Sequence, residues 1–234
     1  MVGYTVYDAD PRVLAWAQAA HRMASKLDTS ERRHGDTWFV GVDALDNAPD
    51  GSVDGVPLAG PWDVATDDLH RAQVSIVYPG YPRQDADESD VAHRFRVKRD
   101  AAHMDGLLPE GAAKRRHLRE PHAYILGVTL NDVAASPLVV WPDSHKIMRA
   151  AFVERFAGIA PDLWAEEDVT DAYQTARRRV FETCTRVPVP LRLGQAVLLD
   201  RHLIHGVAPW DGGGDVPRIV AYFRPQCADV ADWL

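Results

Sequence analysis

Apolar residues recur at two different spacings along the chain, which separates one predicted N-terminal helix from a series of short predicted strands. Residues 11–27 carry apolar side chains at helical spacing, with Asp10 placed to cap the helix and Pro11 suited to its first position. Short apolar stretches bounded by Gly and Pro follow, a pattern typical of strands. These predicted strands are 37–43, 72–78, 94–103, 122–131, 137–141, 186–191, 195–199, 203–207 and 217–224.

A predicted helical block interrupts the strands, at about 145–157 and 161–183. Strands do not alternate with helices along the chain, so a parallel α/β sheet is not expected. Many short strands with Gly and Pro turns favour a mainly β fold, a sandwich or barrel with flanking helices. The second helical segment is expected to pack outside the barrel; alternatively, it covers an active site or forms a dimer contact.

Length and composition are those of one globular domain. The chain has 234 residues, of which 46% are hydrophobic and 26% charged. Its net charge of -8 does not favour binding to nucleic acid or to an anionic membrane. There is no long apolar run and no signal-like start, and only Cys184 and Cys227 are present. We therefore expect a cytoplasmic protein without a disulfide framework.

The tripeptide His103-Met104-Asp105 is the first candidate for chemistry. Residues two apart on a strand point to the same side, so a His nitrogen and an Asp oxygen can reach one metal ion. The pattern is unspecific, because a second HxD occurs at residues 34–36 in a polar stretch, where we predict a turn. The alternative for the first pair is a hydrogen-bonded core histidine and a turn or cap aspartate.

Strand alternation favours the metal-binding interpretation. If residues 94–105 run extended, one face is mostly apolar and includes His103 and Asp105, whereas the other is mostly charged. Both side chains would then point inward. A buried carboxylate is costly unless it is paired or bound to a metal, so this pattern predicts a cationic partner.

A third ligand and an anion clamp follow towards the C-terminus. His205 lies on an apolar stretch and shares a face with Leu203 and Val207. Arg218 comes 13 residues later, which allows two antiparallel strands joined by the DGGGD turn at 211–215. Two histidines and one carboxylate form the ligand set of non-haem Fe(II) oxygenases, and an arginine nearby can clamp a carboxylate.

Three blocks in order make the chain similar to the phytanoyl-CoA dioxygenase-like family. They are HMD at 103–105, LGVTLNDVAASPLVVWPDSHK at 126–146, and LRLGQAVLLDRHLIHGVAPW at 191–210 with Arg218 following. The resemblance covers roughly residues 95–225. It implies a double-stranded β-helix, a cupin-like jelly roll, that uses Fe(II), 2-oxoglutarate and O₂. We expect one oxygenase domain over 1–234, with its metal-binding core at about 70–225 and an N-terminal helix and strands at 1–69.

Carried over by position, the resemblance implies that His103, Asp105 and His205 are the iron ligands and catalytic residues. Arg218 would bind the distal carboxylate of 2-oxoglutarate. Many family members have Ser or Thr two residues after the second histidine, whereas this chain has Val207, and several have Trp where Val128 stands.

Other groups must then help to hold the cosubstrate. Tyr124 is one candidate, on the face of Leu126 and Val128. Arg99 is the other candidate, because it is the one charged residue predicted to lie on the same inward face as His103 and Asp105. A bulge in the strand or a snorkelling side chain would explain this position of Arg99 equally well.

The resemblance implies a dioxygenase that hydroxylates a small molecule and releases succinate and CO₂. Asp105 favours oxidation, since halogenating relatives replace this carboxylate with a small residue. The alternatives are a cupin-type enzyme without 2-oxoglutarate and a catalytically silent binding module, and Arg218 is the residue that distinguishes them. The substrate is not predicted, and a homodimer is possible. Two basic clusters, at 94–99 and 114–119, would either recognise an anionic substrate or form a solvated face.

Overall fold

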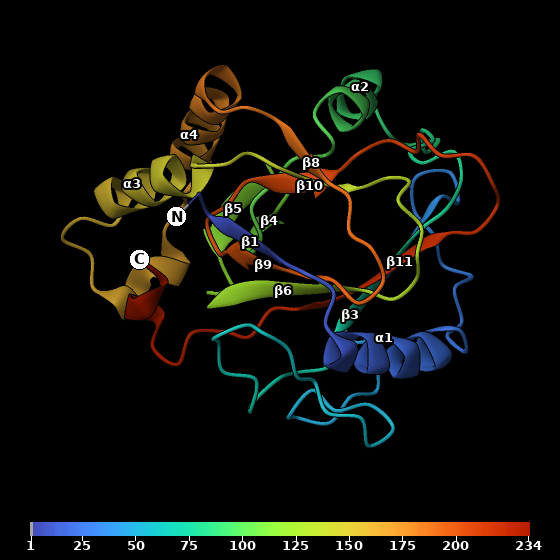
Figure 1. Cartoon of the computed structure of the whole chain (residues 1–234). Coiled ribbons are helices and arrows are strands. Elements are labelled where there is room, and N and C mark those ends of the chain that lie inside the picture. Colours follow the sequence, from blue (N-terminus) through green and yellow to red (C-terminus); the bar gives the residue numbers. More distant parts are fainter. Residues whose placement is uncertain (1) are drawn as a thin grey trace.

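Two antiparallel sheets face each other in the computed structural model, which describes residues 2–234 (Figure 1). The larger sheet has the strand order β1-β9-β6-β11-β3-β2 and the smaller one β10-β7-β8. The strands of the larger sheet are β1 (Tyr4–Tyr7), β2 (Trp38–Gly41), β3 (Gln73–Val77), β6 (Tyr124–Thr129), β9 (Ala196–Asp200) and β11 (Arg218–Phe223). Those of the smaller sheet are β7 (Leu138–Val140), β8 (Val187–Val189) and β10 (His205–Val207).

The chain passes back and forth between the two sheets. After β3 in the larger sheet, His103 pairs with His205 of β10 in the smaller sheet. The chain then continues with β6 in the larger sheet and with β7 and β8 in the smaller one. It returns to the larger sheet with β9, crosses to the smaller sheet with β10 and ends in the larger sheet with β11. This alternation is the double-stranded β-helix, so the predicted jelly-roll fold is confirmed. The strands β10 and β11 were expected to pair across the 211–215 loop. They lie in different sheets, because the loop crosses from one sheet to the other.

The central strands of the larger sheet are buried on both faces. One face of β6 and β11 packs between the two sheets, with Ile125, Val197 and Val220. The opposite face packs under the helix α1 (Pro11–Ala24), where Trp16 contacts the ring of Phe223 at 5.6 Å between centroids. The predicted cap is confirmed, since the Asp10 side chain accepts from the backbone N–H of Arg12 at 2.8 Å.

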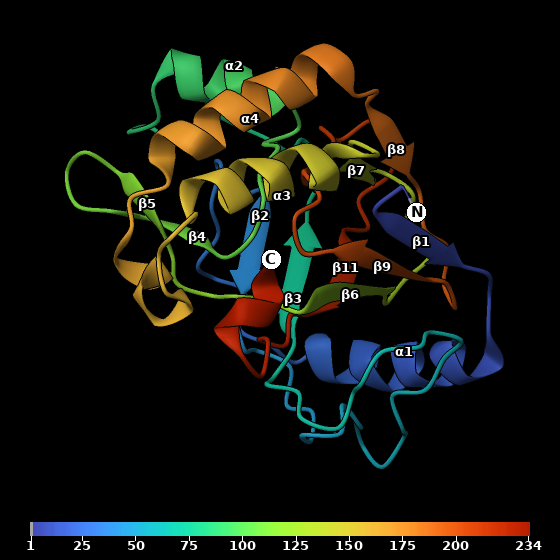
Figure 2. The same cartoon turned by 90° about the vertical axis from the view of Figure 1, so that its left-hand side faces the viewer.

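Helices α3 (Ser144–Arg155) and α4 (Thr170–Thr183) cover the outer face of the smaller sheet (Figure 2). Val139 of β7 points outward into a cluster with Phe152 of α3 and Tyr173 of α4. The segment expected at 161–183 therefore packs outside the barrel, as a 3₁₀ turn η1 (Pro161–Glu166) followed by α4. A second 3₁₀ turn, η2 (Val230–Trp233), adds the buried Trp233 to the same cluster.

Residues 94–103 are not a strand, contrary to the prediction from alternation. Helix α2 spans Asp90–Lys98, and the Ser89 hydroxyl accepts from the backbone N–H of Ala92 at its start. Asp100 and Ala101 then have left-handed backbone angles that end the helix. The argument that residues 94–105 form one strand with His103 on its inward face was therefore wrong. A short, exposed, charged helix can show the same alternation of apolar and charged residues as a strand.

Three further elements were not predicted. The strand β1 lies at one edge of the larger sheet, beside β9, and β4 (Leu107–Glu110) forms a hairpin with β5 (Arg115–Leu118). Together with β2 at the opposite edge, β1 shows that the first 69 residues complete the larger sheet. Among residues 2–234, no helix has the length and apolar character needed to cross a bilayer.

Candidate metal centre

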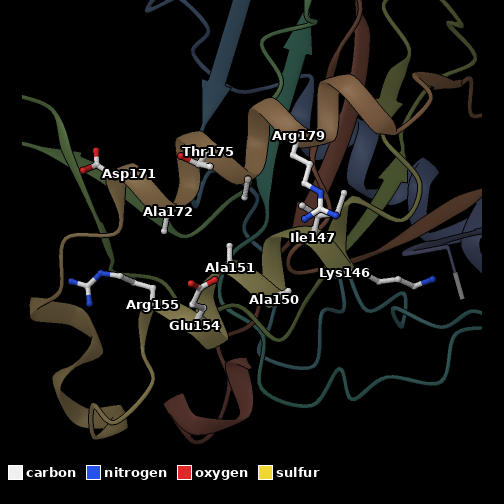
Figure 3. A pocket seen from close by; sticks show the side chains of 11 residues that line it. Lys146, Ile147, Ala150, Ala151, Glu154, Arg155, Asp171, Ala172, Thr175 and Arg179 are labelled. Atoms are coloured by element: carbon white, nitrogen blue, oxygen red, sulfur yellow. The ribbon is translucent and has the colours of Figure 1, made fainter.

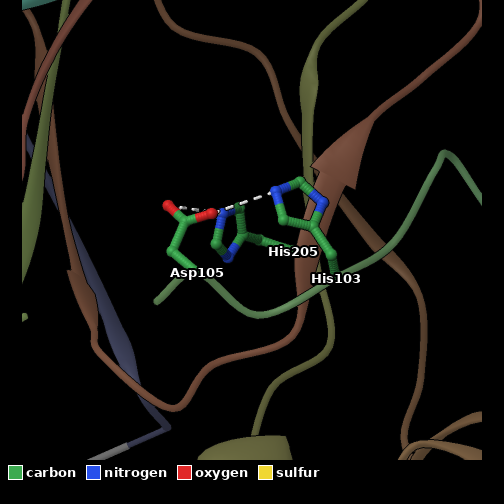
Figure 4. Close-up of side chains that lie close together, drawn as sticks. All are labelled: His103, Asp105 and His205. Carbon is green, nitrogen blue, oxygen red and sulfur yellow. Dashed lines mark ion pairs between the residues drawn. The ribbon is translucent and has the colours of Figure 1, made fainter. Parts of the chain in front are cut away.

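Three side chains from two distant parts of the sequence converge at the end of the smaller sheet (Figure 4). Asp105 Oδ1 lies 3.1 Å from His103 Nε2, and Asp105 Oδ2 lies 3.6 Å from His205 Nε2. The two imidazole rings are 4.8 Å apart between centroids. One ligand atom from each residue lies within 4.8 Å of the others, a spacing that suits a single metal ion.

Backbone pairing places the two histidines side by side. His103 donates its N–H to the His205 carbonyl at 2.9 Å, and His205 donates to the His103 carbonyl at 3.0 Å. Directly opposite residues of an antiparallel pair project to the same face. The close approach requires Gly206, because a Cβ there would lie 2.1 Å from the carbonyl oxygen of Asp100.

The orientation of both imidazoles is fixed by carbonyl groups two residues earlier. His103 Nδ1 lies 3.0 Å from the Ala101 oxygen, and His205 Nδ1 lies 2.9 Å from the Leu203 oxygen. A carbonyl can only accept, so Nδ1 is the donor in each ring and Nε2 is the nitrogen that faces Asp105. This outer contact is the one that metal-binding histidines commonly make.

Asp105 is charged at neutral pH despite its burial. Its side chain is only 14% exposed. Burial by itself raises the pKa of this carboxyl, but the Arg224 guanidinium beside it outweighs burial and holds the pKa below its usual range. Two neutral imidazole nitrogens and one carboxylate, all facing one point, match the donor set that holds Fe(II).

A cavity of about 610 Å³ opens beside the three ligands. Its walls come from both sheets and from the N-terminal strands, including Trp38 and Val40 of β2 and Gln73 and Ser75 of β3. Val207, which stands where a hydroxyl was expected, also lines it. A space of this volume suits a small molecule.

Arg218 is buried on the inner side of the larger sheet without a counter-charge. It is 3% exposed, and neither Nη1 nor Nη2 has a hydrogen-bond partner among residues 2–234. Alternation along β11 puts Arg218 on the same face as Val220 and Tyr222, and Tyr222 lines the cavity. A buried guanidinium is costly unless an anion pairs with it.

The structure does not bring Tyr124 or Arg99 to this cavity. Tyr124 does share a face with Leu126 and Val128, as predicted, but that face packs under α1, and its hydroxyl donates to the Ala65 carbonyl. Burial raises the pKa of this phenol to about 12. Arg99 is exposed at the end of α2 and stacks on Phe181, with 4.7 Å from its guanidinium carbon to the ring centroid.

Arg224 is the residue at this site that sequence reasoning missed. Its Nε donates to Asp105 Oδ2 at 2.5 Å, and it lines the cavity. The signal was available, because Arg224 has the same parity as Arg218 and Tyr222 in the predicted strand 217–224.

The other sequence features have structural explanations. Residues 34–36 form the predicted turn, with positive φ at each, and Asp85 accepts from the N–H groups of His34 and Gly35 at 3.0 and 2.6 Å. His34 and Asp85 form a second possible metal group with Glu88, but Glu88 is already paired with Arg96 at 2.9 Å.

Each basic cluster is partly ion-paired with neighbouring carboxylates. In the second cluster, Arg119 pairs with Glu110 at 2.5 Å, and Arg115 pairs with Asp168. In the first, Arg96 is held by Glu88. None of these arginines lines the cavity beside the triad. The interpretation of the clusters as a solvated face is therefore favoured over recognition of an anionic substrate.

A larger hollow of about 820 Å³ lies between α3 and α4, away from the three ligands (Figure 3). Small apolar residues, among them Ala151, Ala172 and Ala176, line it. Lys146 and Arg179 stand at one end and Asp171 at the other. Among residues 2–234, neither group of possible metal ligands lies in this hollow.

No protein-family model and no curated protein matches this chain. Several solved structures are similar over nearly all of its length. The non-heme alpha-ketoglutarate-dependent epimerase SnoN from nogalamycin biosynthesis is 15% identical, over 95% of this chain and 78% of that chain, with a TM-score of 0.48. EctD from S. alaskensis with bound Fe is 18% identical, over 95% and 72%, with a TM-score of 0.45. HygX from Streptomyces hygroscopicus with nickel and 2-oxoglutarate bound is 17% identical, over 96% and 83%, with a TM-score of 0.46.

Proposed function

We propose that this chain is an Fe(II)- and 2-oxoglutarate-dependent dioxygenase that hydroxylates a small molecule. The observation that carries the proposal is the presence of two complementary features between the sheets. One is the group of His103, Asp105 and His205, whose donor atoms face one point; the other is the buried guanidinium of Arg218, which has no anion. A metal and a dicarboxylate would satisfy both.

In this proposal the three ligands hold Fe(II), and Arg218 receives the distal carboxylate of 2-oxoglutarate. When bound, the metal and cosubstrate activate O₂ and oxidise a C–H bond of the substrate, with release of succinate and CO₂. Arg218 contributes two parallel N–H donors to a carboxylate, in surroundings that Val220 and other apolar residues keep dry. Low polarity strengthens this charge-assisted contact.

A second donor for the same carboxylate is Ser136, at the entrance to β7. Its hydroxyl is fully buried and lacks a hydrogen-bond partner within residues 2–234. The loops that precede β7 and β11 meet at one end of the barrel, where Ala208 donates to the Pro137 carbonyl at 3.0 Å and Ile219 donates to Asn131 Oδ1 at 3.0 Å. Ser136 therefore lies at the Arg218 end, and it replaces Tyr124 and Arg99 in the proposal.

Anaerobic mixing of the protein with Fe(II) and 2-oxoglutarate tests this function. The expected result is a weak visible charge-transfer band in the wild type, which Arg218→Ala weakens. Metal binding without this band, and without succinate formation in screens of metabolite pools, would instead support the alternative of a metal-binding jelly roll that does not use 2-oxoglutarate. The same screens, read as substrate-dependent succinate formation, would identify the substrate.

A further inference from the structure

We propose that Arg224 is a positioning residue of the metal centre, which holds the outer oxygen of Asp105 and so directs the other oxygen to the metal. The inference rests on the proposed function for the identity of the metal as iron. It concerns how the chain itself prepares the carboxylate ligand.

The guanidinium of Arg224 is fixed at three points. Its Nε donates to Asp105 Oδ2 at 2.5 Å, and its Nη1 donates to Gln73 Oε1 at 2.8 Å. Its central carbon lies 5.1 Å from the centroid of the Tyr222 ring. The side chain is 16% exposed. A planar group held in this way presents its donor to Asp105 in one orientation.

The backbone of Arg224 is fixed as well. Its carbonyl lies 3.1 Å from His122 Nδ1 and 3.1 Å from His70 Nε2. The adjoining segment is anchored by Ala123, whose N–H donates to the Pro225 carbonyl at 2.7 Å. Arg224 is thus tied to the larger sheet and to the segment before β6, whereas Asp105 lies in a turn beyond both.

The two oxygens of Asp105 consequently have different partners. Oδ2 accepts the charge-assisted hydrogen bond from Arg224, which occupies one of its lone pairs. Oδ1 lies 3.1 Å from His103 Nε2, whereas Oδ2 lies 3.6 Å from His205 Nε2. Oδ1 is therefore the oxygen that would be free to meet a metal, and Asp105 would then coordinate through one atom. Coordination through one atom leaves more positions open for a cosubstrate.

The charge of Arg224 and its orienting hydrogen bond should have opposite effects on metal affinity, which allows the proposed role to be tested. As a cation, Arg224 repels a metal ion, so simple loss of the charge should tighten metal binding. As an orienting donor, it favours metal binding, and loss of an outer contact of this kind typically weakens metal affinity by about 10–100-fold. A positioning role thus predicts weaker binding for Arg224→Ala although a positive charge has been removed.

The experiment measures Co(II) binding to the full chain by calorimetry and by the visible absorption of bound Co(II). Arg224→Ala and Arg224→Lys are expected to bind Co(II) at least about tenfold more weakly than the wild type, with a changed spectrum. Arg224→Gln, whose amide NH2 can still donate without carrying a charge, should recover part of the affinity. Arg33→Ala is the matched control, because Arg33 lines the same cavity without contacting the three ligands, and it should bind as the wild type does.

Unchanged affinity and spectrum in Arg224→Ala, or wild-type behaviour of Arg224→Lys, would overturn the proposal. If Arg224→Ala does not fold, the Lys and Gln variants decide the question by themselves. A wild type that binds no Co(II) would also reject it. Co(II) binding needs no 2-oxoglutarate, so a wild type that binds Co(II) but gives no charge-transfer band with Fe(II) and 2-oxoglutarate would count against the proposed function and leave the role of Arg224 standing.

Discussion

Individual side chains at this site differ in whether the fold already satisfies them. Asp105 has Arg224 as a counter-charge and both histidines have carbonyl partners, whereas Arg218 has none. The metal-ligand side chains are thus oriented by contacts within the protein, whereas the guanidinium of Arg218 has no partner within the protein. The two kinds of residue should therefore respond differently to substitution.

Arg218→Ala is expected to weaken 2-oxoglutarate binding by about 10–150-fold, since a hydrogen bond to a charged group contributes about 1.5–3 kcal/mol. The affinity is measured by titrating the charge-transfer band of the Fe(II) complex. Co(II) binding should remain, because Arg218 does not contact the triad. Equal 2-oxoglutarate affinity in the variant and the wild type would contradict the assignment of Arg218 to the carboxylate.

Tyr124→Phe should leave 2-oxoglutarate affinity unchanged. The hydroxyl donates to Ala65 on the side of the sheet that packs under α1, so its removal affects only that contact. The free energy of unfolding should fall by about 0.5–1.5 kcal/mol, the usual contribution of such a hydrogen bond. Titration of the same band together with urea denaturation checks both parts, and a loss of cosubstrate affinity would return Tyr124 to the site.

At the scale of elements, the metal centre depends on how closely the segment 100–103 approaches β10.

Predictions from sequence identified β3, β6, β7, β8, β9, β10 and β11 to within a few residues, because each is a short apolar run between turn residues. The same reasoning failed for α2, whose exposed surface carries no apolar stripe wide enough to reveal helical spacing. It also missed β1 and the β4–β5 hairpin, where polar and apolar residues are mixed.

Gly206→Ala should disrupt the metal centre from within β10. The new Cβ would lie 2.1 Å from the Asp100 carbonyl oxygen, which must move and take His103 with it. We expect a loss of Co(II) binding and a lower melting temperature. Gly213→Ala is the control, because no atom lies within 4 Å of the Cβ there and its backbone is outside the left-handed region. Normal Co(II) affinity in Gly206→Ala would show that this segment can shift without moving the ligand.

For the whole molecule, stability should fall in mild acid because of buried neutral histidines. Burial lowers the pKa of His202, although Asp200 opposes this, and the ring packs on Trp233 at 4.5 Å between centroids. Above the ordinary histidine pKa of about 6.5, both folded and unfolded states are neutral. Below it, the unfolded state binds a proton that the folded state excludes, so stability decreases as the pH falls.

His202→Leu should reduce this pH dependence. One such proton changes the free energy of unfolding by up to about 1.4 kcal/mol per pH unit between the two pKa values. Urea denaturation of metal-free protein from pH 7.5 to 5 measures the slope for both proteins. The assignment is tested by the slope and not by the absolute stability of the leucine variant; parallel curves would assign the acid sensitivity to other groups.

The sequence by itself determined the chemistry that the chain can offer. His103, Asp105, His205 and Arg218 were predicted from residue type and spacing together with the resemblance of three ordered blocks to a known family, because ligand chemistry belongs to the side chain. The short apolar runs indicated a sandwich or barrel, and the resemblance implied the jelly roll. Alternation also showed which residues share a face of a strand.

Only the tertiary structure decided which face is inside and what lies across from it. The central strands are buried on both faces, so hydrophobicity could not tell the face of Tyr124, under α1, from the face of Arg218, between the sheets. The contact of Arg224 with Asp105 spans 119 residues. The contact depends on how the strands pair and on where the segment after helix α2 places residues 103–105. No local pattern in the sequence encodes such long-range contacts.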